Sequence, residues 1–437
     1  MRYWFFMLCL CLPLLVYGAP AEVVRPTKAD WPVWPVIPTD NPLTGALAST
    51  GENLHWDAAV PTGATRLFLS NHPETITRFI PEGKLWVEEG KVGDEAVIYR
   101  LFFQHYNHVP APIYLAVILE NLADQGEVTL SGEATATRGV DYGDPERAVW
   151  AAMKRVGERN AYAELSGKLR TPLTPVTAVP KGGERVVIYW KLAPGDLLGG
   201  RMWLTVRRTA GTAPVAFRLS TVWAKSEQGL TGGLPLIPAG EHHPRGTWPV
   251  SAVALRNSAT PFDLGPDEDH GRTVRAIRLC QPVYENGVKV RYTDEVIFTR
   301  TRSANSAQAL ANNGMYGAVV QISLCVKNSG ATPARVGIYL RYPVKDLEGV
   351  YVGAATAYAF DEKAGAWKPA ATKAVDLSNL TYGPVGENKD YDRWWTTAAL
   401  GTYPVQPGET REIPLTLTTD GPAMLPLAIV LRKETAK

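Results

Sequence analysis

The sequence predicts an all-β protein made of two tandem, related β-sandwich domains, immunoglobulin-like or jelly-roll-like, with one short helical insertion in the first. Three observations predict this fold. Segments of β-branched and aromatic residues alternate with period two, and Gly, Pro and Asn separate them. Two stretches far apart in the chain match each other. Helical patterns do not alternate with the strands, which excludes an α/β fold. A barrel remains the alternative.

The repeat is clearest in one pair of segments. Residues 99–119 (YRLFFQHYNHVPAPIYLAVIL) match residues 320–340 (VQISLCVKNSGATPARVGIYL) without a gap, with Asn107 over Asn328. Each segment has the pattern of a strand, a short polar turn and a second strand, which is typical of a hairpin. Two such sheets packed face to face would form a sandwich.

A second pair follows in the same order. Residues 183–207 can be laid over residues 408–432, with Gly183 over Gly408. A chain of 437 residues is too long for one ordinary core, so a duplicated domain fits the length.

The N-terminus has the features of a secretory signal peptide. Arg2 precedes an apolar run over residues 3–17, and the small residues that follow place cleavage between Gly18 and Ala21. The apolar run is shorter than a spanning helix needs, and an uncleaved anchor is the alternative. We therefore expect an extracytoplasmic protein, periplasmic or secreted, with no membrane span after cleavage.

The remaining chain divides by composition. Pro, Trp and Thr fill the first part, which we expect to run extended over the first domain with Trp31 and Trp34 packed down; a binding tail is the alternative. The expected organisation is a signal peptide (1–21), a Pro/Trp-rich lead-in (22–64), a first sandwich (65–225), a Gly/Pro-rich linker (226–270) and a second sandwich (271–437).

One helix interrupts the first domain. Asp144 is a natural N-cap and Pro145 suits the first helical position. Apolar residues then recur at helical spacing, and we expect this stripe to contact the core rather than a partner: Ala148, Val149, Ala152, Met153 and Val156.

Charge and cysteine content narrow the class of protein. A formal net charge of +2 gives no electrostatic reason to bind nucleic acid or an anionic membrane. Two cysteines remain after cleavage, Cys280 and Cys325, on the less apolar faces of their segments. An exported pair is a candidate disulfide, and two unpaired thiols are the alternative.

Motifs that carry chemistry are absent from the expected mature chain. It has no phosphate-binding loop, no GxSxG, no HExxH and no CxxC. His105 and His108 would point to opposite faces of a strand, so we expect structural or exposed histidines there and at His242-His243. The acidic run 267–271 is a weak calcium candidate, and a solvated linker is the simpler interpretation. We expect no catalytic residues, no metal and no cofactor.

Aromatic residues provide the remaining functional candidates. Trp394 and Trp395 follow Tyr391 in the segment DYDRWW, and exposed Trp and Tyr beside polar groups suit sugar rings or protein partners. A core role for these rings is the alternative.

Four short motifs resemble an exported bacterial family of unknown function, a cyanobacterial-type domain with two β-rich halves. They are SNHPE at 70–74, RGTWP at 245–249, NNGMYGAVVQISLCVKN at 312–328 and PGE at 407–409. The resemblance implies export, β-architecture and duplication, and it supplies no catalytic residues.

These observations favour an exported, non-enzymatic protein of the cell envelope or extracellular space, binding or structural, whose partner is an envelope polysaccharide or another surface protein. A carbohydrate-active protein, either a glycan-binding module or a glycoside hydrolase, is the alternative. A hydrolase would need two carboxyl groups at a set separation, which sequence cannot reveal.

Overall fold

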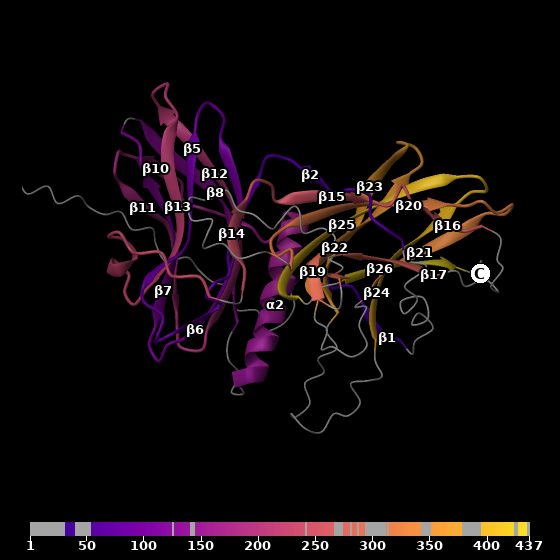
Figure 1. The fold of residues 1–437 in the computed structure, drawn as a ribbon, viewed down its shortest axis with the longest axis horizontal. Coiled ribbons are helices and arrows are strands. Elements are labelled where there is room, and N and C mark those ends of the chain that lie inside the picture. The colour runs from indigo at the N-terminus through magenta and orange to yellow at the C-terminus, as the bar shows by residue number, and fades with distance from the viewer. Residues whose placement is uncertain are drawn as a thin grey trace, which may run out of the picture.

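The computed structural model describes residues 31–39, 54–124, 126–139, 145–240, 243–265, 274–279, 282–285, 288–292, 312, 314–341, 351–377, 395–423 and 427–434. Over this part of the chain the structure is two β-sandwiches with one helix between them (Figure 1). The all-β prediction and the tandem, related sandwiches are confirmed.

The first sandwich consists of sheets A and D. Sheet A has the order β10-β8-β12-β6-β3-β14, with β4 beside β6 and β9 beside β8, and sheet D has the order β11-β7-β13-β5. The strands are β3 (Arg66–Ser70), β4 (Thr75–Thr77), β5 (Gly83–Val92), β6 (Val97–His108), β7 (Ile113–Asn121), β8 (Glu127–Gly139), β9 (Thr171–Pro172), β10 (Val176–Val179), β11 (Glu184–Leu192), β12 (Leu197–Ala210), β13 (Val215–Ala224) and β14 (Arg245–Trp248), and a 3₁₀ turn, η1 (Gln228–Leu230), follows β13.

The second sandwich consists of sheets B and C. Sheet B has the order β2-β15-β20-β25-β22-β23, with β16 beside β20, and sheet C has the order β1-β24-β21-β26-β17. The strands are β1 (Val36–Thr39), β2 (Val60–Thr62), β15 (Ala252–Arg256), β16 (Phe262–Asp263), β17 (Val274–Leu279), β20 (Val319–Lys327), β21 (Ala334–Arg341), β22 (Tyr351–Asp361), β23 (Ala366–Asp376), β24 (Trp395–Val405), β25 (Thr410–Ala423) and β26 (Leu427–Glu434); β18 (Pro282–Glu285) and β19 (Val288–Tyr292) form a separate hairpin.

The two sandwiches have the same topology. The order β8-β12-β6-β3 in sheet A corresponds to β22-β25-β20-β15 in sheet B, and β11-β7-β13-β5 corresponds to β24-β21-β26-β17. In sheet A, β3 is parallel to β6, and in sheet B, β15 is parallel to β20, whereas the other strand pairs in these two series are antiparallel. This shared pattern confirms the duplication.

Asn107 and Asn328 occupy equivalent positions, as predicted. The side-chain amide of Asn107 donates to the carbonyls of Ala111 and Leu192, and that of Asn328 donates to the carbonyls of Thr332 and Val405. Each Asn side chain therefore closes the turn between its two strands and ties it to the strand that precedes the next turn. The predicted hairpins are wrong, however, because β6 and β7 belong to sheets A and D, and β20 and β21 belong to sheets B and C, so each turn crosses from one sheet to the other.

The second predicted match is wrong by one strand. The amide of Gly195 donates to the Asn107 carbonyl, and the amide of Gly408 donates to the Asn328 carbonyl, so Gly195 and not Gly183 corresponds to Gly408. The true repeat is the turn Pro-Gly-acid, at 194–196 and 407–409, with positive φ at both glycines. Residues 180–183 form a similar turn, but there Gly182 has the positive φ and donates to the Asn121 carbonyl, and the turn joins β10 to β11 rather than β11 to β12.

The lead-in packs against the second sandwich rather than the first. β1 forms an edge of sheet C beside β24, and β2 forms an edge of sheet B beside β15. Trp34 lies in the core of the second sandwich, and Trp31 packs against Tyr162 of the helix and Ala374 of β23. Proline keeps these segments at sheet edges, as expected, but their location is a correction.

The expected linker also contributes strands. β14 completes sheet A, whereas β15 and β16 lie beside β20 in sheet B. Trp248, Leu67 and Phe102 of sheet A belong to the same apolar cluster as the second core. The two sandwiches are therefore packed directly on one another.

Helix α2 (Pro145–Ser166) is longer than the short insertion expected, with 22 residues. It lies between the two sandwiches and contacts β8 and β12 of sheet A and β22, β23 and β25 of sheet B (Figure 1). Ala152, Met153 and Val156 are buried, as the stripe predicted; Asp144 and the side chains of Ala148 and Val149 lie outside the described part. No helix among the described residues is long and apolar enough to span a membrane.

A cluster of buried charges joins the helix and both sandwiches. Arg201 of β12 is fully buried and donates to the carboxylates of Glu164 in α2 (3.1 Å) and Asp420 in β25 (2.6 Å). Arg100 of β6 forms an ion pair with Glu164 at 2.9 Å. We call these four residues the interdomain charge cluster.

Candidate functional site

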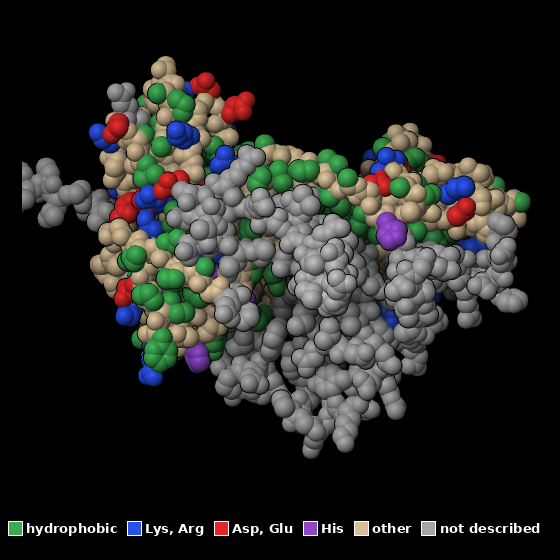
Figure 2. Space-filling model, viewed as in Figure 1, with side chains coloured by type: hydrophobic (Ala, Val, Ile, Leu, Met, Phe, Trp, Pro, Cys, Tyr) green, Lys and Arg blue, Asp and Glu red, His purple; other side chains and the backbone are tan. Residues whose placement is uncertain are grey.

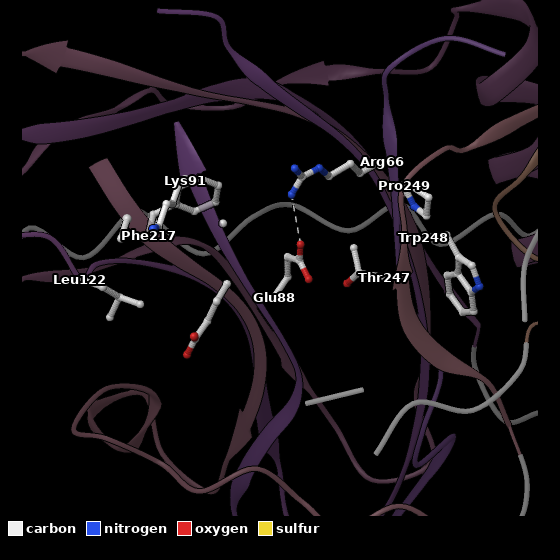
Figure 3. A pocket seen from close by; sticks show the side chains of 11 residues that line it. Arg66, Glu88, Lys91, Leu122, Phe217, Thr247, Trp248 and Pro249 are labelled. Carbon is white, nitrogen blue, oxygen red and sulfur yellow. Dashed lines mark hydrogen bonds and ion pairs between the residues drawn. The ribbon is translucent and has the colours of Figure 1, made fainter. Parts of the chain in front are cut away.

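A pocket of about 320 Å³ opens at one edge of the first sandwich, a volume at the lower end of the range for small-ligand sites (Figure 3). It lies where β5, at the edge of sheet D, faces β3 and β14, at the edge of sheet A. Residues of all three strands line it: Arg66, Glu88, Glu89, Gly90, Lys91, Thr247 and Trp248, together with Leu122, Ala216, Phe217 and Pro249.

Glu88 is the central polar residue of this pocket. The alternation of β5 places it on the inner face with Trp86, and it is 2% exposed. Its Oε1 accepts a hydrogen bond from Nη1 of Arg66 at 3.2 Å (Figure 3), and the same nitrogen donates to the hydroxyl of Tyr99 at 3.3 Å. Burial raises the pKa of Glu88 to about 7, and Arg66 opposes this rise.

Thr247 lies beside Glu88 and is fixed from the other side. The indole Nε1 of Trp86 donates to the Thr247 hydroxyl at 2.9 Å, and this hydroxyl in turn faces the Glu88 carboxyl. This hydroxyl lowers the pKa of Glu88, although Oε2 of Glu88 is buried without a hydrogen bond of ordinary geometry. The pocket thus contains a buried carboxyl oxygen whose hydrogen-bonding capacity is not fully used.

Gly90 provides space in the pocket. A Cβ at this position would lie 2.7 Å from a ring carbon of Phe217 and 3.1 Å from the Tyr99 hydroxyl oxygen. A larger residue would therefore displace the side chains that form the inner end of the pocket.

The second sandwich has apolar residues at the three corresponding positions. Strand pairing places Arg66 of β3 opposite Tyr99 of β6. In the corresponding strands of the second sandwich, it places Val253 of β15 opposite Val320 of β20. Likewise, Glu88 of β5 pairs with Leu219 of β13, and in the corresponding strands Ile277 of β17 pairs with Ile429 of β26. Val253, Ile277 and Val320 are each at most 3% exposed. The fold therefore does not require polar residues at these positions, and the first sandwich alone has them.

The other predicted sites do not converge on this pocket. Tyr391 and Trp394 lie outside the described residues; Trp395 begins β24, where its backbone pairs with Thr39, and its side chain is not described. The acidic run 267–271 and His242 also lie outside the described part. Among the described residues, no group of three His, Cys, Asp or Glu residues could hold a metal ion.

No disulfide is found among the described residues. Cys325 is a buried free thiol, and Cys280 lies outside the described residues. The strands that flank the two cysteines, β17 and β20, belong to opposite sheets of the second sandwich. The pairing of Cys280 with Cys325 therefore stays a prediction.

Three of the predicted histidines are described, and each is structural or exposed, as predicted. His105 is buried, with Nδ1 at 2.8 Å from the Pro73 carbonyl, and burial lowers its pKa to about 4. His108 is exposed at the end of β6. His243 Nδ1 lies 3.2 Å from a carboxylate oxygen of Glu74.

Sequence reasoning missed the pocket, although two signals were present. Glu88 shares the face of Trp86 in β5, and Arg66 shares the face of Phe68 in β3. One of the resembling motifs, RGTWP, supplies Thr247, Trp248 and Pro249 to the lining. What sequence could not show is that β3, β5 and β14 meet at one edge.

Comparisons with known proteins identify no relative. No protein-family model matches the chain, and no curated protein is similar to it. Among solved structures, it is similar to the N-terminal CBM22-1–CBM22-2 tandem domain of Paenibacillus barcinonensis Xyn10C, with 7% identity over 89% of this chain and 100% of that one. The TM-score is 0.11, so this similarity carries no argument about function.

Proposed function

We propose that this chain is an extracytoplasmic binding protein that holds a sugar unit of a polysaccharide in the pocket of the first sandwich. The observation that carries the proposal is the cluster of Arg66, Glu88 and Tyr99, which replaces three buried apolar residues of the duplicated domain. Burying polar groups costs stability, so their presence at the inner end of an open pocket supports a role in binding.

The chemistry of the pocket suits a polyhydroxylated ligand. Arg66 offers donors, the Glu88 carboxyl offers acceptors or a donor according to its protonation, and Thr247 offers a hydroxyl. Sugar hydroxyls donate and accept, so they can pair with all three. The described tryptophans are buried or half-buried, and we therefore propose recognition by hydrogen bonds rather than by stacking on an exposed indole.

Export remains part of the proposal. The basic residue, apolar run and small residues at the N-terminus support it, and so does the resemblance to an exported family with two β-rich halves. On the face seen in Figure 2, basic and acidic side chains are interspersed over the first sandwich, without a broad patch of one sign. This distribution supports a partner other than nucleic acid.

Binding can be tested by calorimetry with oligosaccharides from cell-wall and extracellular polysaccharides. We expect Glu88→Ile, which introduces the residue of the second sandwich, to reduce affinity at least tenfold while the protein stays folded. Arg207→Gln is the matched control, because Arg207 is an exposed residue of the same sandwich remote from the lining. Equal affinity for the wild type and Glu88→Ile would refute the assignment of the site.

The aromatic hypothesis makes the opposite prediction in the same assay. If the segment DYDRWW is the site, Trp394→Ala or Trp395→Ala should abolish binding and Glu88→Ile should not. If the pocket is the site, the two Trp variants should bind as the wild type does.

The hydrolase alternative is distinguished by product analysis. Glu88 has a pKa suited to a general acid, and Glu89 also lines the pocket. Glu89 is held by Arg218, however, with Oε1 at 2.6 Å from Nη2 and 3.0 Å from Nε. We expect no new reducing ends after prolonged incubation with bound oligosaccharides, and their appearance would refute a purely binding role.

A further inference from the structure

We propose that the ligand of the first-sandwich pocket carries a carboxylate, as a uronic acid does, and that Arg66 binds this carboxylate as Glu88 takes up a proton. The inference rests on the proposed function, since it specifies the class of sugar that the same pocket holds. It is carried by the position of Arg66 and by the arrangement of charges around it.

Arg66 is placed to receive an anion. Its side chain is 35% exposed at the pocket, and both of its hydrogen bonds to described residues use the single nitrogen Nη1. A guanidinium presents five N–H donors in a planar fork that matches a carboxylate. The donors on Nε and Nη2 make no hydrogen bond within the described part of the protein, so a ligand carboxylate can pair with them.

The surrounding charges favour a negative ligand. Glu89 and Glu120 are both engaged by Arg218, and Glu120 is also paired with Lys84 at 2.6 Å. Lys91, exposed on β5, lines the pocket. Of the carboxylates near Arg66, Glu88 is therefore the one that can compensate its charge.

The protonation of Glu88 decides whether Arg66 is available. The groups that face Glu88 are Arg66 from β3, Tyr99 from β6, Thr247 from β14 and its neighbour Glu89 in β5. Burial raises the pKa of Tyr99, so its hydroxyl stays neutral. Burial raises the pKa of Glu88 to about 7, and the factor that opposes this rise most is Arg66.

Binding and proton uptake are therefore coupled. A ligand carboxylate that pairs with Arg66 reduces the stabilisation of ionised Glu88 and adds a negative charge nearby, and both effects raise the pKa of Glu88 further. By linkage, a group that gains a proton on binding weakens binding as pH rises above its pKa in the free protein. Affinity should fall by up to about tenfold per pH unit above pH 7.

The near-neutral net charge of the chain does not conflict with this inference. Net charge governs long-range attraction to polyanions, whereas a single carboxylate in a pocket is recognised by short-range hydrogen bonds.

Calorimetry with four probes tests the inference: oligogalacturonate, oligoglucuronate, a neutral hexose oligosaccharide and acetate. Each is titrated at pH 5.5, 7.0 and 8.5, in two buffers with different ionisation enthalpies. We expect a uronate oligosaccharide to bind at least tenfold more tightly than the neutral one at pH 5.5, with uptake of up to about half a proton at pH 7.0, where free Glu88 is already about half protonated, and more at pH 8.5. Acetate should bind weakly, because it lacks the hydroxyl contacts.

Two variants assign the effect to its residues, with Arg207→Gln again as the control. Glu88→Gln carries no ionisable group, so uronate binding should persist without its fall between pH 7.0 and 8.5. Arg66→Gln should remove the preference for uronate over the neutral sugar.

The failures are distinguishable. Equal affinity for acidic and neutral sugars would overturn the carboxylate inference and leave the proposed function in place. Binding of no sugar would overturn both. Acetate affinity equal to that of uronate would overturn the acidic-sugar assignment, and a wild-type pH dependence in Glu88→Gln would overturn the role of Glu88.

Discussion

Replacing Arg201 with Met should reduce the free energy of unfolding by about 3–5 kcal/mol, the cost of breaking a buried ion pair from one side. Arg201 is fully buried, and its four hydrogen bonds reach Glu164 of α2 and three residues of β25: Thr418, Thr419 and Asp420. Met fills similar space but leaves the Asp420 carboxylate without its cation. Burial already raises the pKa of Asp420 to about 7, so the cost should be smaller at pH 5.5, where this carboxyl can protonate.

Urea denaturation followed by circular dichroism and tryptophan fluorescence measures this effect. Because the cluster joins both sandwiches, the two signals should separate in Arg201→Met and coincide in the wild type. Arg218→Met is the matched control: Arg218 is 27% exposed, and an exposed ion pair contributes roughly 0–1 kcal/mol. Adding Asp420→Asn to Arg201→Met should restore part of the loss. A cost for Arg201→Met no greater than for Arg218→Met would refute the reasoning.

Three further outcomes follow from the duplicated architecture. Asn107→Ala and Asn328→Ala should each cost about 1–3 kcal/mol in urea denaturation, because each leaves buried backbone groups without a partner; a negligible cost at either would contradict the equivalence. A carboxyl whose pKa is raised in the folded state destabilises the protein as pH increases, so Glu88 should lower the free energy of unfolding by on the order of 2–3 kcal/mol between about pH 4.5 and 7. The free energy of unfolding of Glu88→Ile, measured across the same range, should lack this decrease. Gly90→Ala should weaken ligand binding in calorimetry, because the added methyl group displaces Phe217. Unchanged affinity would show that the inner end of the pocket is not part of the ligand-binding site.

The fold class was predictable because each strand carries its own alternating pattern. The Asn107 and Asn328 turns were also recognisable, because the residue that closes each turn is the same, but the sequence did not reveal that the two strands beside each turn belong to different sheets. The second match failed for a physical reason: the side chains of Asp196 and Glu409 each accept a hydrogen bond from the backbone amide three residues earlier in equivalent turns, but Asp and Glu differ in identity. The identical Gly-Glu pair at 183–184 gave a closer match in sequence, although the structurally equivalent turn is at 194–196.

Long-range placement was not predictable from local patterns. The lead-in and α2 have apolar residues at suitable spacing, but nothing local specifies which sandwich they cover. Trp31 illustrates this, since its indole donates to Glu158 of the helix at 3.2 Å while its ring packs against β23. The same limit applies to the pocket, whose residues come from strands that are distant in sequence and adjacent only in the folded sheets.

The duplication provides an internal comparison that assigns the pocket to function rather than to folding. Two sandwiches with one topology experience the same packing requirements, and the second meets them with Val253, Ile277 and Val320. At the same positions the first sandwich buries a carboxyl and a phenol beside an arginine, which costs desolvation that apolar residues avoid. A chain that retained only the requirements of the fold would gain stability from apolar residues there. The polar cluster is therefore best explained by a requirement that the second sandwich does not share, and the open pocket above Glu88 is where a ligand would impose it.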